Sequence, residues 1–349
     1  MRYENSEIRT DFAGELVSAL QPARFYFLAQ TIQFLFTSGL YDDLEKGCRL
    51  SSEELERFDS IRIHGLFDYL SNEQLVTVDA SGRYRLTSVG RGFRHFRAWY
   101  ELLLGGYSRT LDELPETMRS ADAYAHRNDA AVGRGSCGIS KYDALPMIEA
   151  LLSEPSAPPA TTIADLGCGD GEIVLQLGGG RTRILGVDPS PASIEAARKH
   201  ATDLDLGLQS EFIAATAEDF LADEERRATP NVCYLAAFAL QEVLEQAGRL
   251  AVVQSVARCL EAPGNSLIVV EVTPFDEDEG PMMHALEVAY YNPYFLMHTV
   301  TRQRLESEVF WRELFAEAGA EVLAWRTTDP LVDSTGHEFG VLLTKVGRL

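Results

Sequence analysis

The sequence predicts an α/β protein in which a doubly wound, mostly parallel sheet follows a smaller helical domain. Its 349 residues exceed the roughly 100–200 residues of one typical domain. From residue 156 onward, short apolar segments alternate with helical patterns, which is typical of a doubly wound sheet. We therefore expect a helical domain over 1–97, a helical connector over 98–155 that contributes to the active site, and the sheet domain over 156–349.

The N-terminal domain has the order helix, helix, helix, hairpin that is typical of a winged helix. Apolar residues recur at helical spacing over Phe25–Leu44, and Ile61–Leu70 is the third helix. Leu75–Asp79 and Arg83–Thr87 alternate as strands around a glycine-containing turn. In a DNA-binding winged helix the third helix would carry basic side chains, whereas this one has a single arginine. We therefore expect the domain to form a homodimer, and a ligand-sensing winged-helix regulator is the remote alternative.

Composition argues against several classes of function. Acidic residues outnumber basic ones by 53 to 31, and the formal charge of −22 repels phosphate backbones, so no nucleic-acid partner is expected. The apolar runs are far shorter than the ~20 residues of a membrane span, and no apolar signal core begins the chain. The five cysteines are scattered without metal-ligand spacing. We expect a cytoplasmic protein without membrane association. The charge favours a cationic small molecule, although solubility alone would also account for it.

The connector contains Gly133–Gly138, a glycine-rich stretch that predicts a flexible turn. Ser136 and Tyr142 are expected to contact the head group of an amino-acid substrate, because a connector in this position can cover the cleft. Arg134 and Asp143 are further candidates. Turn and helix-start roles fit these four residues equally well.

A strand, a glycine-rich turn and a helix open the sheet domain. Thr161–Leu166 is a short buried strand, Gly167–Gly171 is the turn, and Glu172–Leu177 is the helix. Glycines at such a turn let the backbone approach a ligand closely. A second strand, Arg183–Val187, ends at Asp188, 17 residues after the turn. A carboxylate at that point can accept hydrogen bonds from both ribose hydroxyls of a nucleoside.

This segment resembles motif I of the class I S-adenosylmethionine-dependent methyltransferases. The loop reads Asp165-x-Gly-x-Gly-x-Gly171, whereas a dinucleotide site would have G-x-G-x-x-G. The resemblance continues through Val187-Asp-Pro-Ser190 and implies a Rossmann-like domain with a mostly parallel seven-stranded sheet and S-adenosylmethionine as the cofactor. It also implies that Asp165, Gly167 and Gly169 hold the methionine part and Asp188 the ribose. Thr216 stands where the family often has an aspartate near the adenine amino group. Further cofactor contacts are expected from Pro189, Thr216, Ala217, Glu218 and Phe238.

Two carboxylates follow neighbouring strands on the substrate side of the predicted sheet. The fourth strand, Val232–Ala237, leads to Gln241 and Glu242, and the fifth strand ends at Glu271. Ligands of such folds bind beyond the carboxyl ends of the strands, so the two glutamates converge on one cleft. Because a guanidinium pairs bidentately with carboxylates, we expect catalytic roles for Glu242 and Glu271 and a substrate contact from Gln241. For either glutamate alone, a solvated loop charge is the alternative.

His298 is the third candidate for catalysis. It lies in Phe295–Thr301, just before an amphipathic helix expected over Arg302–Ala318. A histidine there can act as a base or contact the substrate. A packed core residue is an equal alternative.

The connector and the first helix also resemble the 2-ketoarginine methyltransferases. The resemblance rests on Val132–Ala144 and Leu16–Leu44, and it extends to the free-arginine guanidino N-methyltransferase of streptozotocin biosynthesis. It implies that the substrate is arginine or its keto acid and that the pathway makes a natural product. Related 2-keto-acid C-methyltransferases bind iron with a His-Asp pair where this chain has Gln241-Glu242, so no metal is expected.

N-methylation of the guanidino group of free L-arginine is the leading expectation. Paired carboxylates without metal ligands would hold the guanidinium and aim one nitrogen at the methyl donor. C3-methylation of 2-ketoarginine is the alternative. It needs a base that removes a proton alpha to the carbonyl group, a role for His298 or a glutamate.

Overall fold

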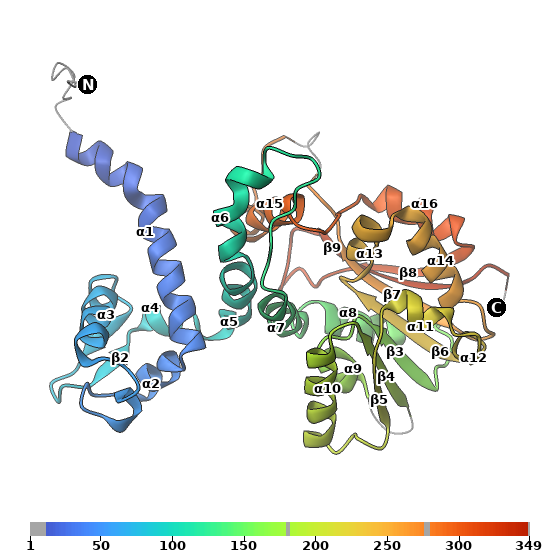
Figure 1. Ribbon diagram of the computed structural model, residues 1–349, viewed down its shortest axis with the longest axis horizontal. Coiled ribbons are helices and arrows are strands. Elements are labelled where there is room, and N and C mark those ends of the chain that lie inside the picture. The colour runs from blue at the N-terminus through green and yellow to red at the C-terminus, as the bar shows by residue number, and fades with distance from the viewer. Residues whose placement is uncertain (1–11, 179–181, 276–279, 348–349) are drawn as a thin grey trace. The chain divides into compact units, whose positions relative to one another are not determined.

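The computed structural model describes residues 12–178, 182–275 and 280–347 (Figure 1). The chain divides into two compact units, Met1–Gly105 and Gly106–Leu349. Residues 1–11, where the sequence shows no apolar signal core, lie outside the described part. Within that part, no helix is both long enough and apolar enough to cross a membrane.

The first unit has the predicted order of helices followed by a hairpin. Asp59 caps the third main helix by accepting a hydrogen bond from the amide of Arg62 at 3.0 Å. The two short strands are antiparallel, with Val76 opposite Leu86. Phe67 and Leu70 pack fully buried in the core of this unit. The unit comprises α1 (Phe12–Thr37), α2 (Leu40–Lys46), the 3-10 helix η2 (Glu53–Leu55), α3 (Ser60–Asn72), β1 (Val76–Val78), β2 (Tyr84–Leu86), α4 (Ser88–Arg91), η3 (Arg94–Phe96) and α5 (Arg97–Tyr100).

The second unit contains a seven-stranded sheet in the order β5-β4-β3-β6-β7-β9-β8. The first five strands of this order are parallel, and β9 runs antiparallel between β7 and β8. The predicted fold class, a mostly parallel seven-stranded sheet after a helical domain, is confirmed. The strands are β3 (Thr162–Leu166), β4 (Arg183–Asp188), β5 (Ser210–Ala214), β6 (Val232–Ala237), β7 (Ser266–Val272), β8 (Ala320–Thr327) and β9 (Glu338–Lys345).

Helices cover both faces of the sheet and make three layers (Figure 1). Each face buries its own apolar cluster, because the central strands are apolar throughout; all seven residues of β7 are buried. One face packs against α8 (Ala144–Leu152), α9 (Glu172–Leu177) and α10 (Pro191–Asp203). The other packs against α11 (Ala217–Ala222), α13 (Leu240–Ala247), α14 (Arg249–Cys259) and α16 (Glu308–Glu317), with α12 (Glu224–Arg227) between α11 and β6 in the chain.

The connector is helical, but its glycine-rich stretch is not the flexible turn that the sequence predicts. The π-helical segment η4 (Glu101–Gly106) leads into α6 (Tyr107–Thr117), and Gly133–Gly138 lies inside α7 (Asp129–Ser140). Asn128 caps α7 by accepting a hydrogen bond from the amide of Ala131 at 3.3 Å. Buried residues recur every fourth position along one face of this helix, which explains why tertiary packing overrides the helix-breaking tendency of glycine. These residues are Ala131, Gly135 and Ile139.

A second helical segment connects β7 to α16. It consists of the π-helical η6 (Glu287–Tyr291) and α15 (Asn292–Val300). His298, which was predicted to lie just before a helix, therefore lies within a separate helix that precedes it. The next helix begins at Glu308, where Ser307 caps it by accepting a hydrogen bond from the amide of Phe310, and not at the predicted Arg302.

Candidate functional site

The glycine-rich loop between β3 and α9 leaves room for a ligand because its glycines carry no side chain. Gly167 and Gly169 have φ angles of 89° and 55°, a region that side chains rarely adopt. A Cβ on Gly167 would lie 3.1 Å from Cβ of Ala239, and one on Gly169 would lie 3.6 Å from Sγ of Cys137 in α7. The loop is thus bordered by the β6–α13 turn and by α7.

Asp188, at the end of β4, lies beside this loop. Its Oδ2 accepts a hydrogen bond from the amide of Gly169 at 3.0 Å, and Oδ1 accepts one from the amide of Ser190 at 2.8 Å. Each carboxylate oxygen can accept a further bond, so the group stays able to bind hydroxyls. Asp165, in β3, is 3 % exposed, and burial, with a smaller effect of the Asp188 charge, raises its pKa to about 7.

The other predicted cofactor residues follow the neighbouring strands at the same edge of the sheet. Pro189 follows β4, while Thr216, Ala217 and Glu218 follow β5. Thr216 caps α11, since its Oγ1 accepts a hydrogen bond from the amide of Asp219 at 3.1 Å. Phe238 follows β6 with a φ of 57°, a costly conformation for a side-chain-bearing residue. Bare backbone beside a strand-end carboxylate fits a nucleoside-bearing cofactor such as S-adenosylmethionine.

Glu271 is fully buried in β7 and holds the start of α13. Its Oε1 accepts hydrogen bonds from the amides of Leu240 at 2.8 Å and Gln241 at 3.2 Å. These amides would otherwise be without partners at the helix N-terminus. Oε2 is buried and has no hydrogen-bond partner within the described part of the chain. Burial raises the pKa of Glu271 to about 8, and the nearby charge of Glu242 adds to the shift.

Glu242 already holds a guanidinium, that of Arg127. Its Oε1 accepts a hydrogen bond from Nη2 of Arg127 at 2.6 Å and a longer one from Nε2 of Gln303 at 3.5 Å. The sequence did not predict Arg127, which lies 115 positions away in the chain. Its Nη1 is buried and has no acceptor in bonding geometry among the described residues.

His298 is buried in α15, with 4 % of its surface exposed. Its Nδ1 lies 2.8 Å from the carbonyl oxygen of Tyr294, which makes Nδ1 the protonated nitrogen and Nε2 the acceptor. Nε2 has no partner within the described residues. Burial lowers the pKa of His298 to about 3, so the ring is neutral near pH 7.

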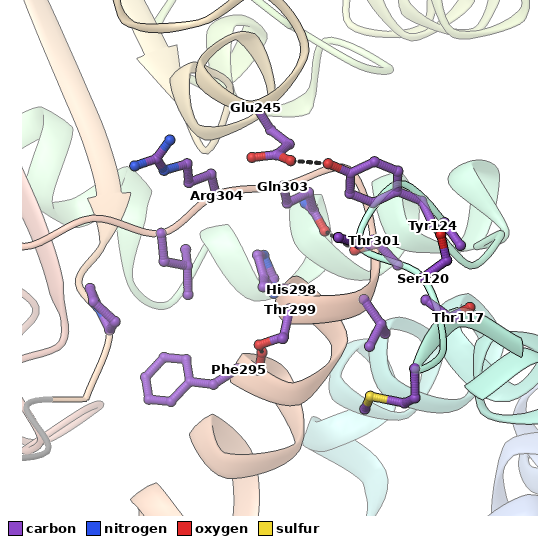
Figure 2. Close-up of a pocket in the computed structure, with 16 residues that line it drawn as sticks. Thr117, Ser120, Tyr124, Glu245, Phe295, His298, Thr299, Thr301, Gln303 and Arg304 are labelled. Atoms are coloured by element: carbon purple, nitrogen blue, oxygen red, sulfur yellow. Dashed lines mark hydrogen bonds between the residues drawn. The ribbon is translucent and has the colours of Figure 1, made fainter. Parts of the chain in front are cut away.

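A cavity of about 480 Å³ opens beside His298, between the end of α6, the end of α15 and residues 301–305 (Figure 2). Tyr124 donates a hydrogen bond to Glu245 across its rim. Of the predicted site residues, only His298 lines this cavity. Gln303 lines it too and connects it to the Arg127–Glu242 pair, since its Nε2 approaches Glu242 and its Oε1 accepts a hydrogen bond from Tyr107 at 3.1 Å.

The predicted substrate residues lie on α7, shortly after it and on α13. Ser136 is half-buried in α7, and its carbonyl oxygen accepts a hydrogen bond from Ser140. Tyr142 follows α7 and is 41 % exposed. Gln241 is buried in α13, where its Nε2 donates to the carbonyl oxygen of Phe238 at 3.3 Å. Their contacts with a substrate stay predictions.

An aromatic cluster on η6 and α15 was not predicted. The rings of Tyr290 and Tyr294 are 5.7 Å apart, and the ring of Tyr294 lies 3.9 Å from that of His298. The helical spacing of aromatic residues from Tyr290 to His298 was the available signal in the sequence.

Comparisons with known proteins agree on one fold and one chemistry. A family model described as a methyltransferase domain matches residues 163–264. A 2-ketoarginine methyltransferase from Streptomyces arginensis is 44% identical over 343 residues, which cover 96% of this chain and 97% of that protein.

Solved structures of similar fold are more distant in sequence. The mitomycin 7-O-methyltransferase has a TM-score of 0.66 at 15% identity, covering 96% of this chain and 98% of that one. An O-methyltransferase from neocarzinostatin biosynthesis, in complex with S-adenosylmethionine and a naphthoic acid, has a TM-score of 0.61 at 17% identity. The match covers 91% of this chain and 96% of that one. At such identities the likeness concerns the fold.

Proposed function

The chain belongs to the family of the 2-ketoarginine methyltransferase of Streptomyces arginensis, and from this premise we propose that it methylates a small guanidino acid with the arginine skeleton. It is an S-adenosylmethionine-dependent methyltransferase, as the resemblance of the glycine-rich loop implied. The observation that carries the proposal is 44% identity along nearly the whole of both chains. The same relative supports an enzyme over a winged-helix regulator.

Two substrates of this class are candidates. N-methylation of free L-arginine accords with the acidic groups around the substrate edge of the sheet. On that route, however, a guanidinium held by Glu242 would displace Arg127. C3-methylation of 2-ketoarginine uses the substrate that the name of the relative gives. Both substrates carry a guanidinium at one end and a carboxylate at the other.

The residues of the chain would bind the acid and remove one proton. When bound, S-adenosylmethionine supplies an electrophilic methyl group and its sulfur keeps the electron pair of the broken C–S bond. Arg127 would take the substrate carboxylate, because its buried Nη1 has hydrogens to donate and no acceptor in bonding geometry among the described residues. The proton would leave the guanidinium in N-methylation or C3 in C-methylation. Among the described residues, His298 Nε2 and, when its carboxyl group is ionised, Glu271 Oε2 are buried acceptors without partners that could receive it.

The proposal is tested by offering the enzyme L-arginine, 2-ketoarginine and ornithine separately, with methyl-labelled S-adenosylmethionine. We expect label in a product of at least one guanidino acid and none with ornithine, which lacks the guanidinium. Label only on a carbon of 2-ketoarginine would exclude N-methylation of arginine. Absence of label from both guanidino acids would refute the proposed substrate class.

A further inference from the structure

Three buried carboxylates gather where α8 meets the start of β9. Asp143 and Asp333 are each 8 % exposed, and Glu338 is 4 % exposed. Asp143 begins α8, and Glu338 is the first residue of β9. Two residues further along β9, Gly340 leaves no space for a side chain, since a Cβ there would lie 2.9 Å from Met147 of α8. This close packing brings the start of α8 to Glu338.

No cation neutralises these carboxylates within the described part of the chain. Among the described residues, no lysine or arginine forms an ion pair with any of them, and Asp143 and Glu338 lie close enough to hydrogen-bond to each other. Burial is the main cause of the raised pKa values of Asp143 and Glu338, and it raises the pKa of Asp143 to about 7. Burying carboxylates without a counter-charge is costly, so the arrangement calls for a cation or a shared proton.

The hydrogen bonds of the cluster leave specific acceptors open. Asp333 is engaged, since it accepts from the amide of Thr335 at 2.8 Å and from the hydroxyl of Tyr291. By contrast, Oε1 of Glu338 is buried and has no donor in strict bonding geometry among the described residues, while the hydroxyl of Thr328 is close enough to the Glu338 side chain to hydrogen-bond to it. Such open buried groups are rare in folded proteins and point to a missing partner.

Aromatic rings border the same place. The phenol of Tyr290 is close enough to Asp143 and Glu338 for their charges to raise its pKa further, beyond the dominant effect of burial. The ring of Tyr291 lies 4.9 Å from that of Tyr290 and 4.8 Å from that of His337. A guanidinium is planar, pairs bidentately with carboxylates and stacks on aromatic faces, so this combination suits it better than a compact ammonium.

The cluster lies at the catalytic edge of the sheet. Glu338 lies opposite Val272 at the end of β7. The neighbouring pair in this antiparallel ladder is Glu271 opposite Phe339. Asp143 follows α7, whose Cys137 borders the glycine-rich loop at Gly169. A substrate with one end here would therefore lie beside the cofactor loop.

We propose that Asp143 and Glu338 form the subsite that binds the guanidinium of the substrate, with Tyr290 beside it. The inference rests on the proposed function, which supplies a guanidino acid as the substrate. It leaves intact the pairs that Arg127 makes with Glu242 and, through Nε at 2.7 Å, with Asp129, and it assigns Nη1 of Arg127 to the carboxylate at the other end of the molecule. In the alternative, the two carboxyl groups share a proton and have only a structural role, which is to connect α8 to β9.

Binding measurements separate these two roles. Calorimetry on the full chain loaded with S-adenosylhomocysteine would compare L-arginine and 2-ketoarginine with their neutral ureido analogues, L-citrulline and its 2-keto acid. The parent should prefer a guanidino ligand by roughly tenfold or more, the usual scale for a charged hydrogen bond. Glu338→Gln and Asp143→Asn should lose most of this preference while they bind S-adenosylhomocysteine as before. Glu149→Gln, the same charge change on the exposed face of α8, should keep it.

The outcomes distinguish the subsite from the function on which it rests. A parent that prefers guanidino ligands, together with folded variants that keep the full preference, would overturn the subsite alone. A parent that binds neither L-arginine nor 2-ketoarginine would overturn the proposed function and the subsite with it. Retained affinity for S-adenosylhomocysteine identifies the variants that have folded.

Discussion

Arg127 and Glu242 act as one unit at the scale of single residues. The carboxylate holds the guanidinium at 2.6 Å, and Gln303 joins the pair from the chain segment after α15. Glu242 was predictable from the sequence because it follows a strand of the predicted sheet. Arg127 was not, because nothing local in the sequence marks a partner 115 positions away.

A double-mutant cycle tests whether Glu242 acts through Arg127. We expect Glu242→Gln and Arg127→Met each to raise KM for the guanidino acid by roughly tenfold or more, with cofactor affinity unchanged. The double variant should be no worse than either single one, because both remove the same carboxylate contact. If Glu242 bound the substrate independently, the two effects would multiply.

The raised pKa of Glu271 predicts how the stability of the protein depends on pH. Its folded pKa of about 8 lies above the value of about 4.3 expected for an unfolded glutamate, so the folded state binds the extra proton. The stability that this proton contributes is complete below about pH 4 and is lost as the pH rises through about 8. Glu271→Gln keeps an oxygen for the amides of Leu240 and Gln241 without titrating.

Urea unfolding of the parent and Glu271→Gln at pH 5 and pH 8 measures this effect. The variant should gain at least about 1 kcal/mol over the parent between these two values. Glu321→Gln, at an exposed position of β8, is the control. An equal pH dependence in parent and Glu271→Gln would show that Glu271 does not carry a raised pKa.

At the scale of elements, the sheet was predictable and the connector was only partly so. Thr161–Leu166 and Arg183–Val187 read as strands, and β3 and β4 match them within a residue at each end. Buried parallel strands are marked by local apolar runs. The glycine-rich stretch of α7 gave the opposite signal, because what makes it helical is packing that a local pattern does not contain. The cap that Glu271 provides for α13 is likewise a contact between distant segments.

Two glycines of similar sequence context should respond in opposite ways to alanine. Gly169 has a φ of 55°, so Gly169→Ala should destabilise the protein by about 1–2 kcal/mol and weaken cofactor binding. Gly133 is helical, and no atom of the described residues lies within 4 Å of an added Cβ, so Gly133→Ala should stabilise the protein by about 0.5–1 kcal/mol. Thermal unfolding with and without S-adenosylhomocysteine measures both. Destabilisation by Gly133→Ala would contradict the helical assignment.

For the whole molecule, we expect a homodimer formed through the first unit. Helix α1 exposes large apolar side chains, a pattern that marks interaction surfaces. Light scattering should give a molecular mass of two chains for the parent. The double variant Leu20→Asp, Phe27→Asp should have the mass of a single chain. Val78→Asp, an equally exposed position of the hairpin, should leave the dimer intact. A monomeric parent would contradict this expectation. The apolar side chains are Phe12, Leu16, Val17, Leu20, Phe25, Tyr26, Phe27 and Phe34.

The central claim is that a guanidino acid with the arginine skeleton receives the methyl group. The most direct measurement supplies methyl-¹³C S-adenosylmethionine with equal amounts of L-arginine and 2-ketoarginine and identifies the labelled product by NMR. We predict one labelled product that retains the guanidino group, with the methyl group either on a guanidino nitrogen or on C3. A cofactor-binding, folded enzyme that labels neither acid would contradict the claim.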